Sequence, residues 1–472
     1  MIKVLNSMKK YNKFTTCIVL FYFILYLVVG LSLLVKQPFG NPPDEYNRYL
    51  IPQYIAEHGT LPNGYEESIR INDYGFSYGF QPILPYMFQG YAMWFVKLFT
   101  TDETALLYTA RGVNLILGLL TAWLVLLLAK EWFRDRHSGW IFAFLATFLP
   151  QSIFIHTYVN TDSCCMLSIV IMLYGLTLGL KSSFSLRSCV IMALGIILCA
   201  LSYYNAYGYI LSSILLFTAF FLTSSGGKLH FHLREFLTKG GFISVLVLLG
   251  ISWWFIRSAI LYEGDFLGLH TRDACAALYA SPAFHPDTRV TWQNQGFSLW
   301  DMLQNSDFWM LSSLSFIGIY GAMDIITSIW VYRFYKSLIF CGILLSVLIP
   351  PSARIHTKEL KQTGKGLRIF YHINMIFCML MPFILSLIYS YSVDYQPQGR
   401  YLLPALLPLC YYVTHGLDKL FRLRPLCAFQ KRFNKPIRTW ASVLLCSVIT
   451  FSLLLTVYGY AFPFYNANSV AP

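Results

Sequence analysis

Residues 105–129 read ALLYTARGVNLILGLLTAWLVLLLA, an apolar run in which Arg111 is the single charged residue. A helix of about twenty such residues crosses the ~30 Å hydrocarbon core of a bilayer. The whole chain has this character, since 56% of its 472 residues are hydrophobic and 12% are charged. A water-soluble protein of this size would lack the polar residues needed to cover its surface. The sequence therefore predicts an integral membrane protein.

Eleven apolar segments follow one another along the chain, separated by polar turns and loops. They predict an all-α polytopic membrane protein of about eleven transmembrane helices, formed as a single membrane domain over residues 1–472 with no separate soluble domain. The segments are approximately 15–35, 105–129, 139–157, 164–180, 189–204, 207–222, 240–260, 329–349, 369–390, 401–417 and 439–460.

A further stretch, 81–100, is apolar enough to cross a membrane but contains Pro82, Pro85 and Lys97. The positive-inside rule decides its place, because short cytoplasmic loops are rich in Lys and Arg. If 81–100 lies along the interface, the inner tail and loops hold 24 of the 35 Lys and Arg residues but 5 of the 22 Asp and Glu residues. If it crossed, this asymmetry would be reversed. We therefore expect an amphipathic helix on the outer surface. The inner segments are then the amino-terminal tail, 130–138, 181–188, 223–239, 350–368 and 418–438.

This topology predicts a protein of the cell membrane with a cytoplasmic amino terminus. Two long loops lie outside, a first outer loop at about 37–104 and a second at about 261–328. Loops longer than a connection requires usually carry function. The net charge of +13 is explained by the inner loops. Membrane lipids are therefore expected partners and nucleic acid is not.

Polar residues stand at three places on the outer side. The first outer loop begins with Asn41-Pro42-Pro43-Asp44-Glu45, and a short turn between two apolar segments contains Asn160-Thr161-Asp162. Gln398-Gly399-Arg400-Tyr401 opens a late segment on the side that is poor in cations. Each has a simpler reading, because the acids are typical of helix starts and an arginine near a helix end reaches lipid headgroups. Their common placement at the outer ends of segments favours one convergent polar pocket.

In order and placement, these motifs resemble the C-type (GT-C) superfamily of membrane glycosyltransferases, which includes protein O-mannosyltransferases and aminoarabinose transferases. The resemblance is closest to a bacterial polytopic branch with a Pro-Pro-Asp-Glu motif. It covers most of the chain, through 42–45, Arg111, 160–162, 315–321 and 398–404. One departure is Arg48, which stands where this branch commonly has a histidine. The resemblance implies a GT-C-like helix bundle with interfacial helices in the first outer loop.

The resemblance also implies a polyprenyl-phosphate-linked sugar as donor and an extracytoplasmic acceptor, which would be a cell-envelope glycan, a glycolipid or a protein. Transfer to a hydroxyl requires a carboxylate that takes its proton, and Asp44 is the candidate base. The leaving phosphate requires a cation, for which Arg400 is the first candidate and Arg111 the second. One carboxylate and one cation describe a single displacement, which predicts inversion at the sugar.

The remaining candidates have supporting roles. Glu45 and Asp162 are expected to orient the acceptor or to hold a divalent metal ion between them, and two acids do not decide whether a metal is needed. Asn160, Gln398 and Tyr401 are candidate substrate-binding residues beside these acids. Arg333, near the start of a late apolar segment, is a candidate for the groove that binds the lipid phosphate.

Two other functions fit the same residues. A transporter or flippase of lipid-linked sugars also needs outer polar groups, although such proteins usually show internal repeats and paired broken helices, and the sequence shows neither. A polymerase or ligase of lipid-linked oligosaccharides is close in chemistry and is not distinguished by the sequence.

Overall fold

Each predicted apolar segment is helical in a computed structural model that describes residues 13–225, 228–348, 364–423, 426 and 437–468. Seven helices of this described part are long and apolar enough to cross a bilayer. The chain is therefore a multi-pass helical membrane protein. The seven lie in α2 (Lys13–Lys36), α5 (Glu103–Trp132), α8 (Asp162–Ser182), α11 (Leu233–Leu261), α15 (Ile329–Leu348), α16 (Lys365–Ser392) and the run from α19 (Ile437–Leu454) through the π-helical η5 (Leu455–Ala461).

The other four predicted segments form shorter or interrupted helices, so the count of eleven crossings stays a prediction. One of them is broken between Thr147, where α6 ends, and Pro150, where α7 begins. These segments are α6 (Arg136–Thr147) with α7 (Pro150–Phe154), α9 (Leu186–Ala200), α10 (Tyr207–Phe220), and the 3-10 helix η4 (Gly399–Ala405) followed by α17 (Leu406–Phe421).

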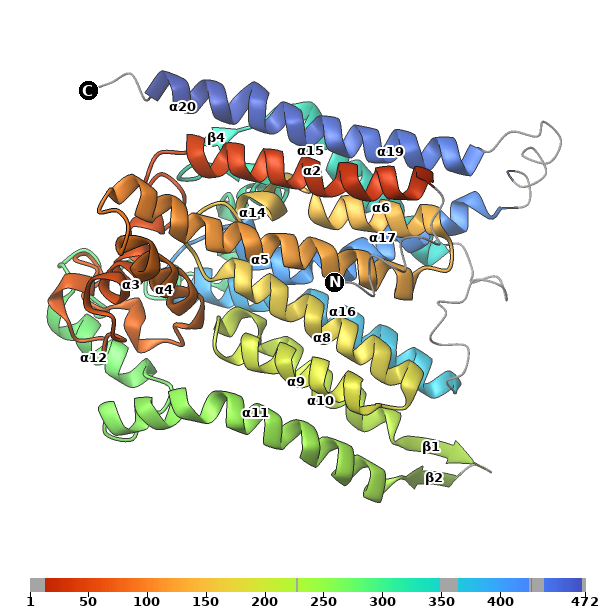
Figure 1. The fold of residues 1–472 in the computed structure, drawn as a ribbon, viewed down its shortest axis with the longest axis horizontal. Helices are drawn as coiled ribbons and strands as arrows, with labels where there is room; N and C mark the ends of the chain where they lie inside the picture. The colour runs from red at the N-terminus through yellow and green to blue at the C-terminus, as the bar shows by residue number, and fades with distance from the viewer. Residues whose placement is uncertain (1–12, 226–227, 349–363, 424–425, 427–436, 469–472) are drawn as a thin grey trace.

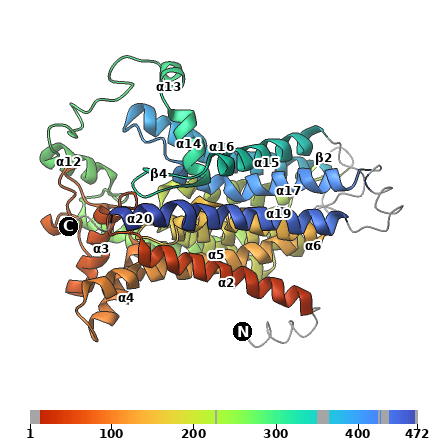
Figure 2. The same cartoon turned by 90° about the horizontal axis from the view of Figure 1, so that it is seen from above.

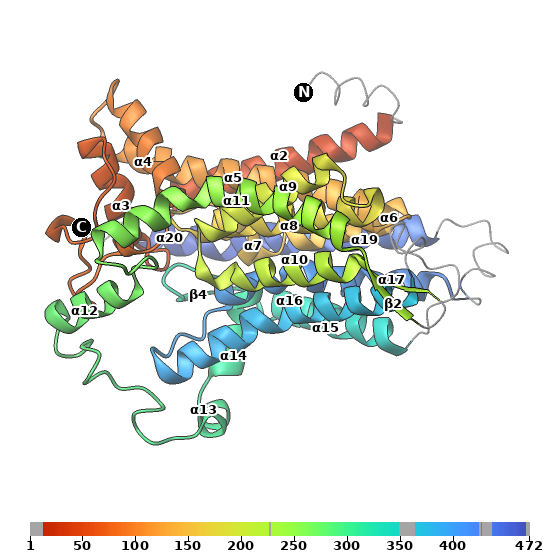
Figure 3. The same ribbon diagram turned by 90° about the horizontal axis from the view of Figure 1, so that it is seen from below.

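The long helices run side by side and form an elongated bundle (Figure 1). Short helices of the two predicted outer loops gather at one end, which we call the loop end (Figures 2 and 3). The opposite end, the hairpin end, carries a small antiparallel hairpin (Figure 3). Helices at the loop end are α3 (Glu45–His58), α4 (Leu84–Lys97), α12 (Leu269–Tyr279), α13 (Leu299–Asn305), α14 (Phe308–Gly318) and α20 (Phe462–Asn468), with 3-10 turns η1 (Glu67–Ile69), η2 (Tyr78–Phe80) and η3 (Tyr204–Ala206).

Strands are confined to two short hairpins in the described residues, so the all-α prediction holds for the bundle. The hairpin at the hairpin end pairs β1 (Leu222–Ser225) with β2 (Lys228–Phe231). The other pairs β3 (Ile319–Tyr320) with β4 (Ile325–Ile326) directly before α15. The predicted cytoplasmic tail at 1–12 and most of the inner loops at 350–368 and 418–438 lie outside the described residues.

The core of the bundle is centred on α8. Its most apolar stretch is 94% buried, whereas the corresponding stretch of α11 is 17% buried. Because α8 has protein on all sides, its amino-terminal turn at 160–162 is held inside the bundle and not at its surface.

The ambiguous stretch at 81–100 forms α4, a helix of 14 residues that is not among the seven long spans. It has Pro85 in its first turn and packs against α3 and α5 at the loop end. One face is buried through Tyr86, Gln89 and Met93, while Tyr91 and Phe95 are exposed. This is the amphipathic character expected of an interfacial helix.

Two glycines let α15 and α17 approach closely. A Cβ atom on Gly416 would lie 1.9 Å from the carbonyl oxygen of Gly342, so the helices cannot keep their separation if Gly416 gains a side chain. Small residues at such contacts are typical of helices packed in membranes.

We therefore expect Gly416→Ala to lower the apparent melting temperature in detergent, with a cost of about 1–3 kcal/mol for overpacking. Gly112→Ala is the matched control, because a Cβ on Gly112 in α5 would meet nothing within 4 Å. That control should be neutral or slightly stabilising, since alanine is favoured over glycine within helices. Equal melting temperatures for both variants would show that the α15–α17 contact does not limit stability.

Candidate functional site

The candidate site is a cluster of two carboxylates and two guanidinium groups at the loop end, formed by Asp44, Arg48, Asp162 and Arg400, which we call the ion cluster. Its members come from three separate parts of the chain: the start of α3, the first residue of α8, and the 3-10 helix η4. Asp44 and Arg400 are 356 positions apart in sequence. The fold therefore brings together the acid and the cation that the sequence predicts on the outer side of the membrane.

Asp44 is the N-cap residue of α3, yet its side chain makes no capping hydrogen bond. Its backbone has φ of 61°, in the left-handed region that aspartate tolerates better than most residues. The side chain accepts a hydrogen bond from Arg400 Nη2 and lies 3.7 Å from Arg48 Nη2. With 30% of the side chain exposed, Asp44 is the accessible member of the Asp44–Arg400 pair. The reading of Asp44 as a helix cap alone is therefore wrong.

The two arginines also set the protonation of Asp44. Burial by itself would raise the pKa of this carboxyl, but the positive charges of Arg400 and Arg48 and their hydrogen bonds outweigh burial and hold the pKa below its usual value. Asp44 is therefore ionised at neutral pH.

Arg400 is buried, so the reading in which it reaches out to lipid headgroups is wrong. Its Nη2 also donates to the Tyr401 hydroxyl at 2.9 Å, and the guanidinium lies 4.9 Å from the centre of the Tyr401 ring. Its Nε is buried without a hydrogen-bond partner among the described residues. The preceding Gly399 is required for close packing, because a Cβ there would lie 1.9 Å from the backbone nitrogen of Phe316. The Gly399-Arg400 pair thus seats the arginine against α14.

Arg48 belongs to the ion cluster, although the motifs in the sequence do not predict it as a site residue. Its Nη1 donates to the Tyr86 hydroxyl at 3.0 Å and to Thr161 Oγ1 at 3.1 Å. Its guanidinium lies 4.8 Å from the centre of the Tyr78 ring. The i,i+4 spacing from Asp44 on a helix beginning at Glu45 was a sequence signal for this pair.

Asp162 is 5% exposed, and its Oδ2 has no hydrogen-bond partner among the described residues. Arg48 and Arg400 are the cations near it, and Arg48 donates to the adjacent Thr161. The N-cap of α8 is Thr161, so Asp162 is not the capping residue. A buried carboxylate oxygen without a partner is costly unless a ligand or a water molecule satisfies it.

Glu45 and Arg111 form a second, closed pair. Arg111 Nε and Nη2 donate to Glu45 Oε1 and Oε2 at 2.8 and 2.6 Å, and both side chains are completely buried. The backbone N–H groups of Gly40 and Val159 also donate to Glu45, at 3.1 Å each. Arg111 further donates to the carbonyl oxygens of residues 34, 37 and 38 at the end of α2. This pair ties α2, α3 and α5 together, and the contacts give no support to substrate roles for Glu45 or Arg111.

Asn160 is also engaged within the protein. Its side chain donates to the carbonyl oxygens of Ile155 and Tyr158 at 2.7 and 2.9 Å and accepts from the Ser163 N–H at 3.1 Å. It is completely buried and shapes the turn that presents Asp162. These contacts indicate a positioning role and give no support to direct substrate contact.

Of the three other predicted binding residues, two adjoin the ion cluster. Tyr401 hydrogen-bonds Arg400, and Gln398 has a buried Oε1 without a partner among the described residues. Arg333 instead lies exposed on α15, with its guanidinium 5.4 Å from the Trp330 ring centre. No hydrogen bond or ion pair within the described part of the chain joins Arg333 to the ion cluster.

The predicted metal pair, Glu45 with Asp162, does not fit the geometry. Both oxygens of Glu45 accept hydrogen bonds from Arg111, and the charge beside Asp162 comes from arginines. No group of three or more His, Cys, Asp or Glu side chains in the described residues is arranged to hold a metal ion.

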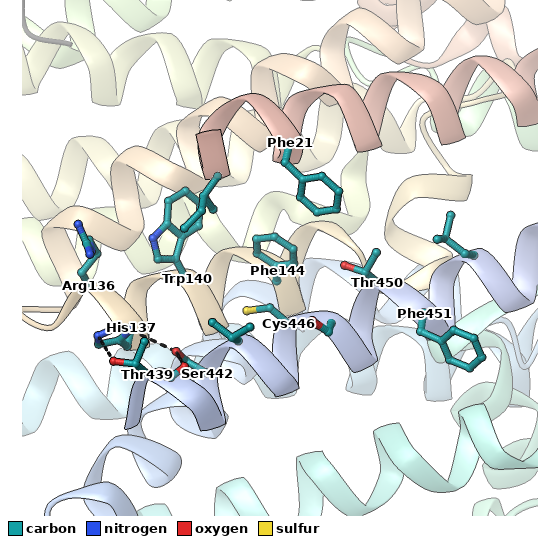
Figure 4. A pocket seen from close by; sticks show the side chains of 14 residues that line it. Phe21, Arg136, His137, Trp140, Phe144, Thr439, Ser442, Cys446, Thr450 and Phe451 are labelled. Atoms are coloured by element: carbon teal, nitrogen blue, oxygen red, sulfur yellow. Dashed lines mark hydrogen bonds between the residues drawn. The ribbon is translucent and has the colours of Figure 1, made fainter. Parts of the chain in front are cut away.

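A separate cavity of about 360 Å³ lies between α2, α6 and α19 (Figure 4). Its walls are mostly apolar, with Phe21, Trp140 and Phe144 among them. Near Arg136, the His137 ring contacts the hydroxyls of Thr439 and Ser442 at 3.3 and 3.2 Å. None of its 14 lining residues is acidic, so this cavity does not contribute to the ion cluster.

The sequence matches no protein-family profile and no curated protein. Among solved structures, the chain is similar to an oligosaccharyltransferase of Archaeoglobus fulgidus tethered to an acceptor peptide, at a TM-score of 0.48 and 15% identity over 92% of this chain and 54% of that one. It is also similar to oligosaccharyltransferase AglB from the same organism in complex with an inhibitory peptide and a dolichol-phosphate, at a TM-score of 0.47 and 14% identity over 95% and 56% of the two chains.

A third similar structure is ArnT from Cupriavidus metallidurans bound to undecaprenyl phosphate. Its TM-score is 0.41, with 14% identity over 86% of this chain and 78% of that one. The chain thus spans little more than half the length of the archaeal oligosaccharyltransferases that it matches.

Proposed function

We propose that this protein is a glycosyltransferase that moves a sugar from a polyprenyl-phosphate donor to a hydroxyl of an extracytoplasmic acceptor. One observation carries the proposal: at the loop end, a partly exposed carboxylate, Asp44, lies against the buried guanidinium of Arg400, with that of Arg48 close by. The class of donor comes from the motif resemblance of the sequence to the C-type superfamily.

Arg400 receives the phosphate of the donor. Its planar guanidinium matches two phosphate oxygens, and its unpartnered Nε gives it a further donor for a bound anion. When the bond between the anomeric carbon and the phosphate oxygen breaks, both electrons stay on the phosphate. The arginine stabilises that developing charge, so the leaving group needs no general acid.

Asp44 receives the proton of the acceptor hydroxyl. In the structure it is a weak base, because Arg400 and Arg48 lower its pKa. A donor phosphate competes with Asp44 for these two cations, and a carboxylate released from them regains basicity. Donor binding therefore prepares the base. The acceptor oxygen attacks the anomeric carbon from the face opposite the phosphate, which inverts the sugar configuration.

The test measures transfer of radiolabel from a panel of polyprenyl-phosphate sugars in proteoliposomes. Both the labelled product and the membrane leaflet that contains the label are recorded. Wild-type protein is expected to move label from lipid to acceptor. If labelled lipid instead appears intact on the other leaflet, the protein is a transporter and the proposal is wrong.

Arg400→Gln is expected to weaken binding of the polyprenyl phosphate by roughly 10- to 100-fold, the loss typical of hydrogen bonds to a charged group. Arg333→Gln is the matched control, since Arg333 is exposed and lies outside the ion cluster. Equal binding by the two variants would remove Arg400 from the phosphate site. Weaker binding in Arg333→Gln alone would indicate that the lipid-phosphate groove lies at α15.

A further inference from the structure

A continuous chain of hydrogen bonds leads from Arg400 away from the ion cluster. The Tyr401 hydroxyl accepts from Arg400 and donates to Gln396 Oε1 at 2.6 Å. The Gln396 amide then donates to Asp394 Oδ2 at 2.6 Å, and the Tyr74 hydroxyl donates to the same oxygen at 3.4 Å. We call these four residues, Tyr74, Asp394, Gln396 and Tyr401, the polar chain.

The polar chain lies beyond the bundle, where three segments meet. Asp394 and Gln396 follow the last residue of α16, and Tyr74 belongs to the first predicted outer loop. The second outer loop covers them, because Arg289 Nη1 donates to the Val393 carbonyl at 3.3 Å and the Arg289 guanidinium lies 5.5 Å from the Tyr74 ring centre. The residues of the polar chain are therefore brought together by the tertiary fold and not by a local turn.

The groups of the polar chain are neither buried nor fully satisfied. All four side chains are half-buried. Within the part of the chain that the structure describes, no cation lies at ion-pair distance from Asp394. Beside the polar chain, the Tyr395 hydroxyl, Gln398 Oε1 and Arg289 Nε are buried without hydrogen-bond partners among the described residues. The cluster thus offers a carboxylate, amides and phenols to a ligand.

Aromatic rings border these polar groups. The ring of Phe284 lies 4.9 Å from that of Tyr74, and the ring of Trp292 lies 6.3 Å from that of Tyr395. A carboxylate and an amide recognise adjacent hydroxyls by hydrogen bonding, while aromatic rings pack against the apolar faces of sugar rings. The terminal nitrogens of Arg289, the cation beside the polar chain, are engaged by the carbonyl oxygens of Val393 and Phe284, at 3.3 and 3.0 Å. The carboxylate of Asp394 has no ion-pair partner among the described residues, so it repels an acidic group bound against it and attracts a basic one.

We infer that the polar chain is a carbohydrate subsite that binds the acceptor through a neutral or amino sugar and excludes acidic sugars. This inference rests on the proposed function and names its acceptor class. The donor keeps its lipid in the membrane and its phosphate at Arg400, and the exposed part of the Asp44 side chain, 30% of it, receives the acceptor. A sugar held by Asp394 and Gln396 presents a neighbouring hydroxyl toward Asp44.

The test measures binding of methyl glycosides to the complete purified protein by saturation-transfer NMR, with no donor present. The probes are methyl glucoside, methyl glucosaminide and methyl glucuronide. Wild-type protein is expected to bind the first two and not the glucuronide. Asp394→Asn should weaken the first two roughly tenfold, as expected for hydrogen bonds to a charged group, and should reduce the discrimination against glucuronide.

Asp287→Asn is the control, because this carboxylate of the second outer loop is 87% exposed and pairs with His285 alone among the described residues. Glycoside binding that is unchanged in Asp394→Asn, or a preference for glucuronide, would overturn the inference.

Because the assay needs no transfer, its outcome is separate from the proposed function. Sugar binding without transfer would leave the subsite intact and refute the enzyme, whereas transfer with an unchanged acceptor KM in Asp394→Asn would refute the subsite alone.

Discussion

The Asp44→Asn substitution is expected to lower sugar transfer by about 100- to 10,000-fold, the usual contribution of a positioned general base. Asparagine keeps the size of the side chain and still accepts a hydrogen bond from Arg400, but it cannot take the proton of the acceptor. Donor binding should be retained or tightened, because Arg400 and Arg48 lose the anion that competes with the phosphate. The measurements are initial rates of transfer and donor affinity on the same preparation.

The matched control for this prediction is Asp73→Asn. Asp73 is an exposed carboxylate of the same predicted outer loop and lies outside the ion cluster. Its replacement should leave transfer unchanged. Full transfer by Asp44→Asn would remove Asp44 from the mechanism and leave Asp162 as the remaining carboxylate of the ion cluster.

The Glu45→Gln substitution is expected to destabilise the protein by about 3–5 kcal/mol, the cost of breaking a buried ion pair and leaving one charge uncompensated. Arg111 would then be a completely buried cation facing an amide, with its remaining contacts limited to carbonyl oxygens at the end of α2. The melting temperature in detergent should fall by many degrees, and the yield of monodisperse protein should fall with it.

Arg272→Gln provides the comparison for the ion pair of Glu45. Arg272 and Asp273 also form a close pair, at 2.6 Å, but their side chains are 28% and 64% exposed. Surface pairs of this kind contribute about 0–1 kcal/mol, so the melting temperature should hardly change. A Glu45→Gln protein as stable as Arg272→Gln would show that the Glu45–Arg111 pair is not a structural clamp, and the substrate role first considered for Glu45 would return.

The behaviour of the adjacent acids shows where sequence reasoning stops. Asp44 and Glu45 form one acidic motif in the sequence, yet they take part in different contacts. Asp44 ends outside the helix and faces Arg400, whereas Glu45 begins α3 and points into the protein toward Arg111. The left-handed backbone of Asp44 lies outside the helical geometry that begins at Glu45, so the two neighbouring side chains point in different directions. Which acid was accessible depended on how α3 packs.

The roles of Arg48 and Asn160 also depend on the tertiary structure. The sequence marked Arg48 as a departure from a family pattern, and the fold makes it a member of the ion cluster held by Tyr86 and Thr161. The position of Asn160 beside Asp162 in sequence predicts a shared binding role, but the side-chain amide of Asn160 makes its hydrogen bonds within the turn itself.

The sequence by itself determined the helical membrane class, the positions of the apolar helices and the end of the bundle at which polar residues collect. These properties follow from local composition, because an apolar run of sufficient length must satisfy its backbone as a helix in lipid. Only the tertiary structure decided which charges pair, which acid stays accessible and which side chains are used up in turns. Partner choice between residues such as Glu45 and Arg111, 66 positions apart, depends on how separate helices pack, and no local pattern contains that information.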